Sequence, residues 1–484
     1  MNSRAVLIAC AGLLSTGCSV GPNFERPAAP SEHSYDTPQP SDGSPAAATL
    51  AERPASGADV PAQWWQLFES ASLDQTLRRA LADNPTLSAA DATLAAAREA
   101  IVVARAGWLP RLGASASAQR GGNSGGGGGS SSAAAGAALY SVGLTSSYTL
   151  DAFGATRRLV EQQRSLAELQ RYQLAAAYLS LTGNVVTEAL TIASTRAQLD
   201  ATYALLADDE KNLKLTQREY EAGAAARTDV LTAEGQLASD QTSLPTLLQQ
   251  LSAARHALAI LVGSTPSQWS PPEFDLKEFT LPADLPVSLP SALVRQRPDI
   301  LASEAQLHAD SAAVGIAVAQ EFPSTTLSGA LTRESMTAAD LFHGFDSLWS
   351  VGGALAQPLF EGGALRAQAR AARDTFRGQA ASYREVVLTA FGQVADDLRA
   401  LEHDADRVLA FRRSLRIAAD SLALQRASYA AGASNVLQLI DAERSYAQAL
   451  LGSVGAEAQQ LQDSVQLFVA LGGGWWNSPA VPPA

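Results

Sequence analysis

The sequence predicts a mixed α and β fold in which long antiparallel coiled-coil helices accompany four β-strands. The first observation is an internal duplication, because Tyr220-Glu-Ala-Gly-Ala returns 209 residues later as Tyr429-Ala-Ala-Gly-Ala. The second is a change of hydrophobic period within each copy, from alternation typical of strands to the three-and-four spacing of helices. Solenoid repeats are at most roughly 50 residues long, so this longer unit indicates a duplicated domain half.

The N-terminus predicts a lipoprotein signal peptide over residues 1–17. Arg4 precedes the apolar stretch Ala5 to Leu14, and small residues lead to Cys18. We expect a diacylglycerol and an N-acyl chain such as palmitate on Cys18, and no other cofactor. Two alternatives are an ordinary secretory signal with a free cysteine and lipidation at Cys10, whose apolar stretch is short for export. Ser19 is typical of lipoproteins sorted to the outer membrane.

Composition argues against several classes of function. The net charge of −13 disfavours nucleic acid as a partner. Five scattered histidines lack metal-ligand spacing, and both cysteines lie in the first 20 residues. No later stretch has 18 consecutive apolar residues, so no transmembrane helix is expected. We interpret the acidic pairs Asp208-Asp209 and Asp396-Asp397 as solvated helix faces, and no catalytic residues are predicted.

The first half begins with a lipidated tether over 18–71, rich in Pro, Ser and Ala. The first structural repeat, 72–263, starts with helices that restart after Asn84-Pro85. A β-hairpin is expected at about 111–150, because alternate residues from Tyr140 to Leu150 are apolar on one side and small and polar on the other. About ten residues of this kind are typical of a membrane strand.

A long helical hairpin, about 155–262, completes the first repeat. Its first helix contains no proline up to Ala222, and Gly223 is expected to end it as a C-terminal cap. Asp229 is expected to cap the return helix, which Pro245 should interrupt.

The second half repeats this order after a linker over 264–290. The second repeat, 291–472, contains a β-hairpin at about 323–360 and a helical hairpin at about 364–471, followed by a tail over 473–484. Gly432 should end the long helix, and Asn435 should cap the return helix. Gly452 and Gly455 are expected to soften that helix where Pro245 breaks the first.

The two β-hairpins leave two interpretations open. They are either ordinary exposed hairpins of a soluble protein or four membrane strands. Four strands cannot close a barrel, for which about eight are needed, and free strand edges in lipid are costly. The membrane interpretation therefore requires oligomers, and strand number alone permits a dimer or a trimer.

Several segments resemble the outer membrane factor lipoproteins of the TolC superfamily, especially the OprM/NodT-type branch. The matching segments span nearly the whole chain: Cys18-Ser-Val-Gly-Pro-Asn-Phe-Glu-Arg-Pro27, Trp64-Trp-Gln-Leu-Phe68, Arg297-Pro-Asp299, Leu437-Gln-Leu-Ile-Asp-Ala-Glu-Arg-Ser445 and Ala470-Leu-Gly-Gly-Gly-Trp-Trp476. The resemblance implies a homotrimer with a twelve-stranded β-barrel in outer membrane lipid and a periplasmic α-barrel. It also implies export of drugs or other toxic small molecules, delivered by an inner-membrane pump of the RND type and a periplasmic adaptor protein.

The resemblance places a periplasmic gate beyond the second turn. The corresponding residues beyond the turn are Leu437, Gln438 and Asp441, with Gln438 where some relatives carry a second acid. Tyr429, just before the turn, is assigned to the same gate, where such tyrosines tie the hairpins closed in relatives, and packing alone is its alternative role. Helical tips and adaptor docking are assigned to Tyr220, Gly223, Arg227, Asp229, Gly432 and Asn435. An ion pair with Arg444 is the alternative role for Asp441.

Two function classes remain from the sequence. The chain is expected to be an outer-membrane efflux channel, lipid-anchored and extending into the periplasm. The alternative is a structural lipoprotein that spans the envelope without a pore. An enzyme is not expected, because no pattern brings a nucleophile, a base and an orienting group together.

Overall fold

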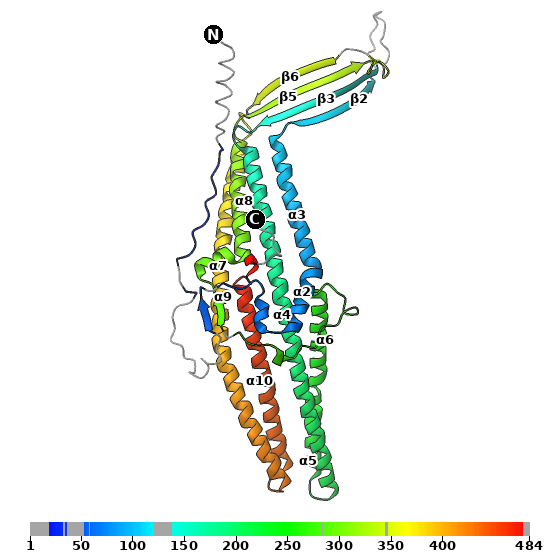
Figure 1. The fold of residues 1–484 in the computed structure, drawn as a ribbon, viewed down its shortest axis with the longest axis vertical. Coiled ribbons are helices and arrows are strands. Elements are labelled where there is room, and N and C mark those ends of the chain that lie inside the picture. The colour runs from blue at the N-terminus through cyan, green and yellow to red at the C-terminus, as the bar shows by residue number, and fades with distance from the viewer. Residues whose placement is uncertain are drawn as a thin grey trace, which may run out of the picture. The chain divides into compact units, whose positions relative to one another are not determined.

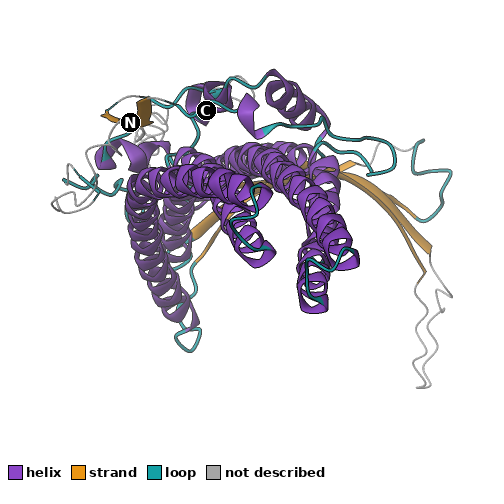
Figure 2. Cartoon of the chain, turned by 90° about the horizontal axis from the view of Figure 1, so that it is seen from below, coloured by secondary structure: helices purple, strands orange, loops and turns teal. Residues whose placement is uncertain are grey.

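The computed structural model describes residues 19–31, 34–35, 53–57, 59–120, 138–282, 284–343 and 347–477. The predicted signal peptide, Cys18 and the glycine-rich loop 121–137 lie outside these residues. The chain divides into two compact units. The first comprises Met1–Pro27, Thr93–Gln170 and Ser303–Tyr383, and the second comprises Ala28–Ala92, Arg171–Ala302 and Arg384–Ala484. Helix is the main component of the chain, as Figure 2 shows.

The first unit contains one four-stranded antiparallel sheet in the order β2-β3-β5-β6 (Figure 1). Its strands are β2 (Arg111–Arg120), β3 (Ala138–Leu150), β5 (Ser324–Ser335) and β6 (Ser347–Ala356). Each repeat supplies one hairpin, as predicted, and β3 pairs with β5 to join them. Strands β2 and β6 are the two edges of the sheet.

The register brings the apolar residues of the strands onto one face. Leu144 pairs with Leu331, and Leu331 pairs with Trp349. Directly paired residues of antiparallel strands point to the same side. The side chains on this face are exposed. Trp349 is 75% exposed, and Val351, two residues along β6 on the same face, is 81% exposed. The opposite face carries mainly Ser, Thr, Gly and Ala, with Leu139 and Leu348 near the ends of their strands. The sheet therefore has one mainly apolar and one mainly polar side.

Long helices follow each hairpin, as the duplication predicted. Helices α4 (Ala155–Glu221) and α9 (Ala364–Ala430) both have 67 residues. Shorter helices α3 (Pro85–Arg105) and α8 (Pro298–Ala319) precede the two hairpins. None of the described helices is both long and apolar enough to cross a bilayer.

The two return helices differ in a way the sequence did not predict. The first is broken at Thr242 into α5 (Arg227–Gln241) and α6 (Ser243–Leu261), close to Pro245. The second, α10 (Val436–Ala470), is continuous. The predicted interruption near Pro245 is confirmed, whereas Gly452 and Gly455 produce no break in α10. A Cβ on Gly452 would lie 2.6 Å from Cδ1 of the Phe411 ring, so this glycine admits the ring of α9.

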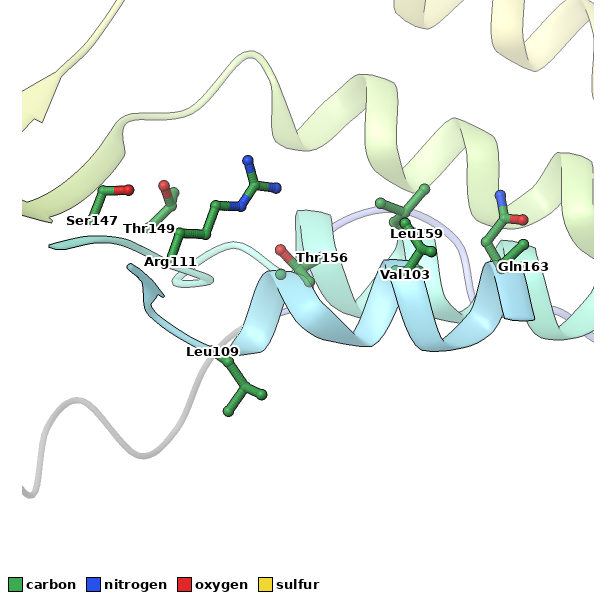
Figure 3. Close-up of a pocket in the computed structure, with 11 residues that line it drawn as sticks. Val103, Leu109, Arg111, Ser147, Thr149, Thr156, Leu159 and Gln163 are labelled. Carbon is green, nitrogen blue, oxygen red and sulfur yellow. The ribbon is translucent and has the colours of Figure 1, made fainter. Parts of the chain in front are cut away.

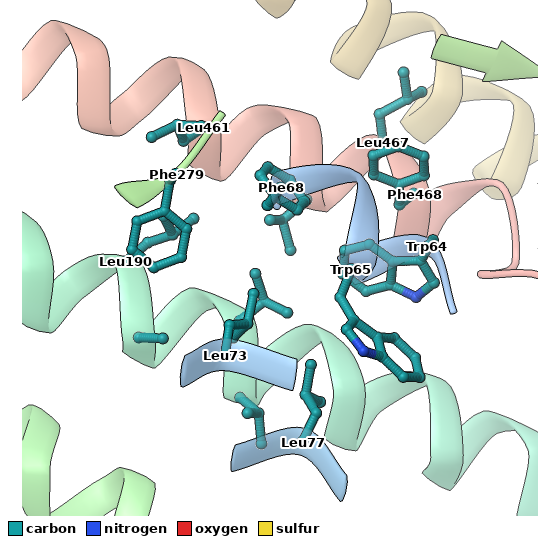
Figure 4. Close-up of a cluster of buried hydrophobic side chains, with 14 of the residues drawn as sticks. Trp64, Trp65, Phe68, Leu73, Leu77, Leu190, Phe279, Leu461, Leu467 and Phe468 are labelled. Carbon is teal, nitrogen blue, oxygen red and sulfur yellow. The ribbon is translucent and has the colours of Figure 1, made fainter. Parts of the chain in front are cut away.

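The core of the second unit includes segments that the sequence assigned to the tether and the linker. Helix η2 (Trp64–Phe68), in the predicted tether, contributes buried aromatic side chains, and α2 (Ala71–Asp83), at the start of the first repeat, contributes buried leucines (Figure 4). Trp64 stacks on Phe468 of α10 with ring centroids 5.2 Å apart. Strand β1 (Arg53–Ser56) pairs in parallel with β4 (Asp284–Val287). Both segments thus help to build this unit.

Each of the remaining short elements belongs to one of the two units. Helix η3 (Ala106–Trp108) belongs to the first unit, whereas η4 (Leu276–Glu278), α7 (Pro290–Gln296) and η5 (Trp475–Asn477) belong to the second. The side chain of Arg297, directly after α7, donates 3.1 Å to the carbonyl of Ala470 at the end of α10. This contact ties the start of the second repeat to its last helix.

Candidate functional site at the helical tips

Two glycine turns close the helical hairpins at one end of the second unit (Figure 1). Gly223 and Gly432 have φ angles of +78° and +71°, in the left-handed region that favours glycine. Beyond them, Ala224 N donates 2.7 Å to the Glu219 carbonyl, and Ala433 N donates 2.9 Å to the Ser428 carbonyl. Both helices therefore end in the same C-terminal capping geometry, at duplicated positions.

The return helices begin with different caps. Asn435 is the N-cap of α10, and its side chain accepts 3.0 Å from Gln438 N. The expectation that Asp229 caps α5 in the same way was wrong in position, because the helix begins two residues earlier at Arg227 and the N-cap is Ala226. Asp229 instead accepts 2.9 Å from the Ala226 N–H, which is the reciprocal half of a capping box.

Tyr429 connects the two helical hairpins. Its hydroxyl donates 2.7 Å to the carboxylate of Glu219, which lies on α4 of the other hairpin. Burial and this carboxylate raise the pKa of Tyr429, so it stays a donor. Beside it, Val436 and Ile440 of α10 pack with Ala233 of α5. This hydrogen bond and a small apolar cluster therefore join the two hairpins at their tips.

A charged network lies next to this contact. Arg426 of α9 donates 2.5 Å to Asp208 of α4 and 3.2 Å to Glu443 of α10. Asn212 of α4 also donates to Glu443, whose side chain is only 4% exposed. Burial raises the pKa of Glu443 although Arg426 opposes this. The network borders a cavity of about 460 Å³ that also reaches Tyr429.

Two carboxyl pairs, each with one buried and one half-buried member, lie farther along the hairpins. Asp209 is 5% exposed, and burial together with Asp240 raises its pKa to about 7. Asp404 is 6% exposed, and burial together with Asp463 raises its pKa to about 7. The expectation that Asp208-Asp209 forms a solvated face was wrong for Asp209, because the antiparallel partner helix covers it.

The pairs share a further feature. In each, a glutamine one turn before the second acid donates to it, Gln236 to Asp240 at 2.8 Å and Gln459 to Asp463 at 2.9 Å. The two hairpins therefore use the same side-chain arrangement at different distances from their turns.

Three of the predicted gate residues are exposed on α10 in the single chain, whereas Tyr429 lies half-buried on α9. Leu437 is 43% exposed, and Gln438 and Asp441 are also exposed. Leu437 and Asp441 lie one turn apart, on one face. Asp441 forms no ion pair with Arg444 or any other described residue. The predicted tip residues Tyr220, Arg227 and Asn435 are exposed as well, so they are available to a partner.

Sequence reasoning missed Glu219, Arg426 and Asp208 as tip residues, and it included Glu443 only within the family-like segment Leu437 to Ser445. A signal was present. Tyr220 and Tyr429 occupy equivalent positions, so residues near 220 should lie beside Tyr429 when the two hairpins pack side by side. Glu219 is the neighbouring acid and completes the contact.

A second cavity lies in the first unit, where helix gives way to strand. It has a volume of about 590 Å³ and lies among α3, α4, β2 and β3 (Figure 3). Val103, Leu109 and Leu159 line it together with Arg111, the one charged residue of its lining. Leu109 and Val103 are 66% and 75% exposed, so this junction offers an apolar surface.

Comparison with known proteins decides the family. A family model described as outer membrane efflux protein matches residues 76–264 and 289–473, one match for each repeat. The chain belongs to the outer membrane efflux protein family. Its location is the outer membrane, and its role is efflux.

Relatives of this efflux protein extend over nearly the whole chain. It is 31% identical over 477 residues to outer membrane protein OprJ of Pseudomonas aeruginosa, covering 97% of this chain and 95% of the relative. It is 30% identical over 480 residues to the pyoverdine export outer membrane protein OpmQ of the same species, covering 98% and 97%. Nodulation protein T of Rhizobium leguminosarum bv. viciae is 30% identical over 482 residues, with 98% and 94% covered.

Solved structures agree with the fold of the efflux protein. The outer-membrane channel OprN superposes with a TM-score of 0.84 at 28% identity, covering 95% of this chain and all of that chain. The open state of the MtrE outer membrane channel of Neisseria gonorrhoeae gives a TM-score of 0.75 at 26% identity, with 95% and 99% covered. The predicted resemblance to TolC-type channels is confirmed.

Proposed function

We propose that this efflux protein is the outer-membrane channel of a tripartite system, in which an inner-membrane pump of the RND type and a periplasmic adaptor deliver small molecules to it. The observation that carries this proposal is the sheet, whose register aligns exposed apolar residues on one face and small polar residues on the other. An apolar outside and a polar inside are typical of membrane strands that enclose a water-filled passage.

Closure of the sheet requires further copies. Strands β2 and β6 are edges with free backbone groups, which are too costly to leave unpaired in lipid. Both have ten residues, so β2 of one chain matches β6 of the next in length. Three copies give a twelve-stranded barrel. The apolar cavity beside Arg111 lies next to β2 and would be covered by the neighbouring copy.

Passage is controlled at the tips. In a trimer, Leu437 and Asp441 form two rings, one apolar and one negatively charged, at the narrow end of the helical tunnel. The Tyr429–Glu219 hydrogen bond and the Arg426 network hold the two hairpins together and favour a closed gate. Exposed Tyr220, Arg227 and Asn435 are the surface offered to the adaptor. Opening then requires that adaptor contacts outweigh the bonds at Tyr429 and Arg426.

The lipid anchor is part of the proposal. Cys18 carries the diacylglycerol and N-acyl chains, and Ser19 directs the protein to the outer membrane. The anchor adds membrane affinity to that of the barrel, with about 0.8 kcal/mol for each buried methylene group.

Reconstitution tests the channel. We expect the purified protein to migrate as a heat-sensitive trimer in SDS and to produce stepwise single-channel currents in planar bilayers. A folded protein that gives no current at any voltage would instead support a structural lipoprotein that spans the envelope.

A further inference from the structure

The chain segment that directly follows Cys18 is held against the first unit by a buried arginine. Arg158, near the start of α4, is 4% exposed. Its guanidinium donates 3.2 Å to the Val20 carbonyl, 3.4 Å to the Gly21 carbonyl and 2.9 Å to the Asn23 side chain. A fourth bond of 2.8 Å goes to Glu161 on its own helix. The Arg158 side chain therefore binds three residues of the N-terminal segment, Val20, Gly21 and Asn23.

Glycines allow this segment to lie close to the unit. Gly21 has a φ of +90°, and a Cβ built on it would lie 2.5 Å from the Gly315 Cα of α8. A Cβ on Gly315 would lie 2.8 Å from the Arg158 side chain. Ser19 packs on Gly154 in the same way, where a Cβ would lie 2.9 Å from the Ser19 hydroxyl. Side chains at any of these positions would push the segment away.

Aromatic and charged contacts complete the binding site. The Phe24 ring stacks on His308 of α8 with centroids 4.3 Å apart and an interplanar angle of 11°. His308 Nε2 lies 3.0 Å from Glu161, the same carboxylate that pairs with Arg158. Arg26 pairs with Glu304 at 2.5 Å. We call Arg158, Glu161, Glu304, His308 and Gly315 the N-terminal seat.

The seat ends at the boundary between helix and sheet. Val20 N donates 3.2 Å to the carbonyl of Phe153, which lies between the last residue of β3, Leu150, and the first residue of α4, Ala155. Cys18 directly precedes Ser19 in the sequence. Without the seat, the eight residues from Ser19 to Arg26 would allow a displacement of roughly 15 Å.

We propose that Arg158 is a positioning residue that fixes the lipid-bearing N-terminus beside Gly154, where the apolar face of the sheet begins. This inference rests on the proposed function, because it takes the sheet to lie in the membrane and Cys18 to be lipidated. The seat binds the segment through two backbone carbonyls, the Asn23 amide, the Phe24 ring and the Arg26 guanidinium. The acyl chains thus enter the bilayer next to the strands of their own chain.

Two spin labels measure the position of the segment. Labels at Glu25→Cys and Arg157→Cys, both exposed, report the distance between the N-terminal segment and α4. We expect a narrow distance distribution in the otherwise unchanged protein and a broad one after Arg158→Ala. Arg158→Lys should also broaden it, because an ammonium cannot make the same set of planar bonds. An unchanged narrow distribution in both variants would overturn the proposal.

Proteolysis gives a second measurement with a matched control. Cleavage after Glu25 should accelerate by at least about tenfold in Arg158→Ala, since one charge-assisted hydrogen bond contributes about that factor. Arg157→Ala removes an equal charge from the neighbouring residue outside the seat and should leave the rate unchanged. The double variant Asn23→Ala, Phe24→Ala alters only the segment and should accelerate cleavage even if Arg158→Ala misfolds. Equal rates in all variants would contradict the proposal.

A lipid-free variant separates this inference from the proposed function. Cys18→Ser, exported with an ordinary secretory signal, should retain slow cleavage and the narrow distance distribution, because the seat contacts residues 19–26. Rapid cleavage in this variant would show that the lipid, and not Arg158, holds the segment. Absence of lipid on the natural Cys18 would overturn the anchor but leave the measured position of the segment intact.

Discussion

Tyr429 and Glu219, on the long helices of different hairpins, are joined by a 2.7 Å hydrogen bond just above the two glycine turns. The bond spans the two halves of the duplication, yet the halves do not contribute alike. Tyr220, the counterpart of Tyr429, is 45% exposed. The duplication builds two similar hairpins. Tyr429 of the second hairpin makes the contact with the first, whereas its counterpart Tyr220 is exposed.

Loss of this bond should favour opening of the gate. Tyr429→Phe keeps the ring and removes the donor, which costs about 1.5–3 kcal/mol for a bond to a charged group. We expect a larger open probability in single-channel recordings. Tyr220→Phe is the matched control at the duplicated position and should conduct as the natural protein does. Equal open probabilities in the two variants would argue against a latch at Tyr429.

The Arg426 network predicts an effect on stability. Arg426→Ala leaves the buried carboxylate of Glu443 without its cation, and we expect a loss of about 1–3 kcal/mol, reduced because Arg426 is 47% exposed. Denaturant unfolding of the purified protein measures it. Arg444→Ala removes an exposed arginine one residue from Glu443 and should change stability by less than about 0.5 kcal/mol. A similar loss in both variants would mean that net charge, not the pair, is responsible.

Asp404 predicts a pH dependence of stability. Its pKa is raised from 3.8 to about 7 in the folded chain, so the unfolded chain releases this proton first. Its contribution to stability is present below about pH 4, falls as pH rises and is lost above about pH 7. Asp404→Asn should flatten this decline and increase stability at pH 8.

Denaturant midpoints measured from pH 4 to pH 8 test the carboxyl pair. Asp420→Asn is the matched control for loss of one carboxylate from α9, because Asp420 is exposed. An Asp404→Asn profile as steep as that of the natural protein would show that burial beside Asp463 does not raise the pKa of Asp404.

Alanine substitutions at two glycines of α10 should change the stability of the protein in opposite directions. Gly452→Ala places a methyl group against the Phe411 ring and should cost about 1–3 kcal/mol through overpacking. A Cβ at Gly455 meets no described atom within 4 Å, so Gly455→Ala should add roughly 0.5–1 kcal/mol through helix propensity. Thermal unfolding measures both. Stabilisation by Gly452→Ala would indicate that Phe411 rotates away without cost.

Much of the fold could be predicted because its signals are local. Gly223 and Gly432 end helices through their own backbone freedom, and alternation along β3 and β5 depends only on neighbouring residues. The core roles of Trp64 and Phe279 were missed, since their irregular spacing in Pro-rich segments has no period. The burial of Asp209 was missed because it depends on which residue of the partner helix faces it.

The candidate site was predictable where symmetry helped. Tyr429 and Asn435 follow from the duplicated turns, whereas Glu219 and Arg426 required the relative rotation of two hairpins. The Gly452 contact likewise depends on the height at which Phe411 meets α10. Distances between residues of different helices are set by packing. The periodicity of a single helix carries no information about that packing.

Closure of the sheet by neighbouring copies is the central claim, and cross-linking of the two edge strands tests it most directly. Cysteine pairs are placed one on β2 and one on β6, scanned along both strands, and oxidised in the membrane. We predict that cysteine pairs in register yield covalent trimers on SDS gels when the samples are heated without a reducing agent. We also predict that no larger species forms. Covalent dimers as the final product, or no cross-link at any register, would contradict the account.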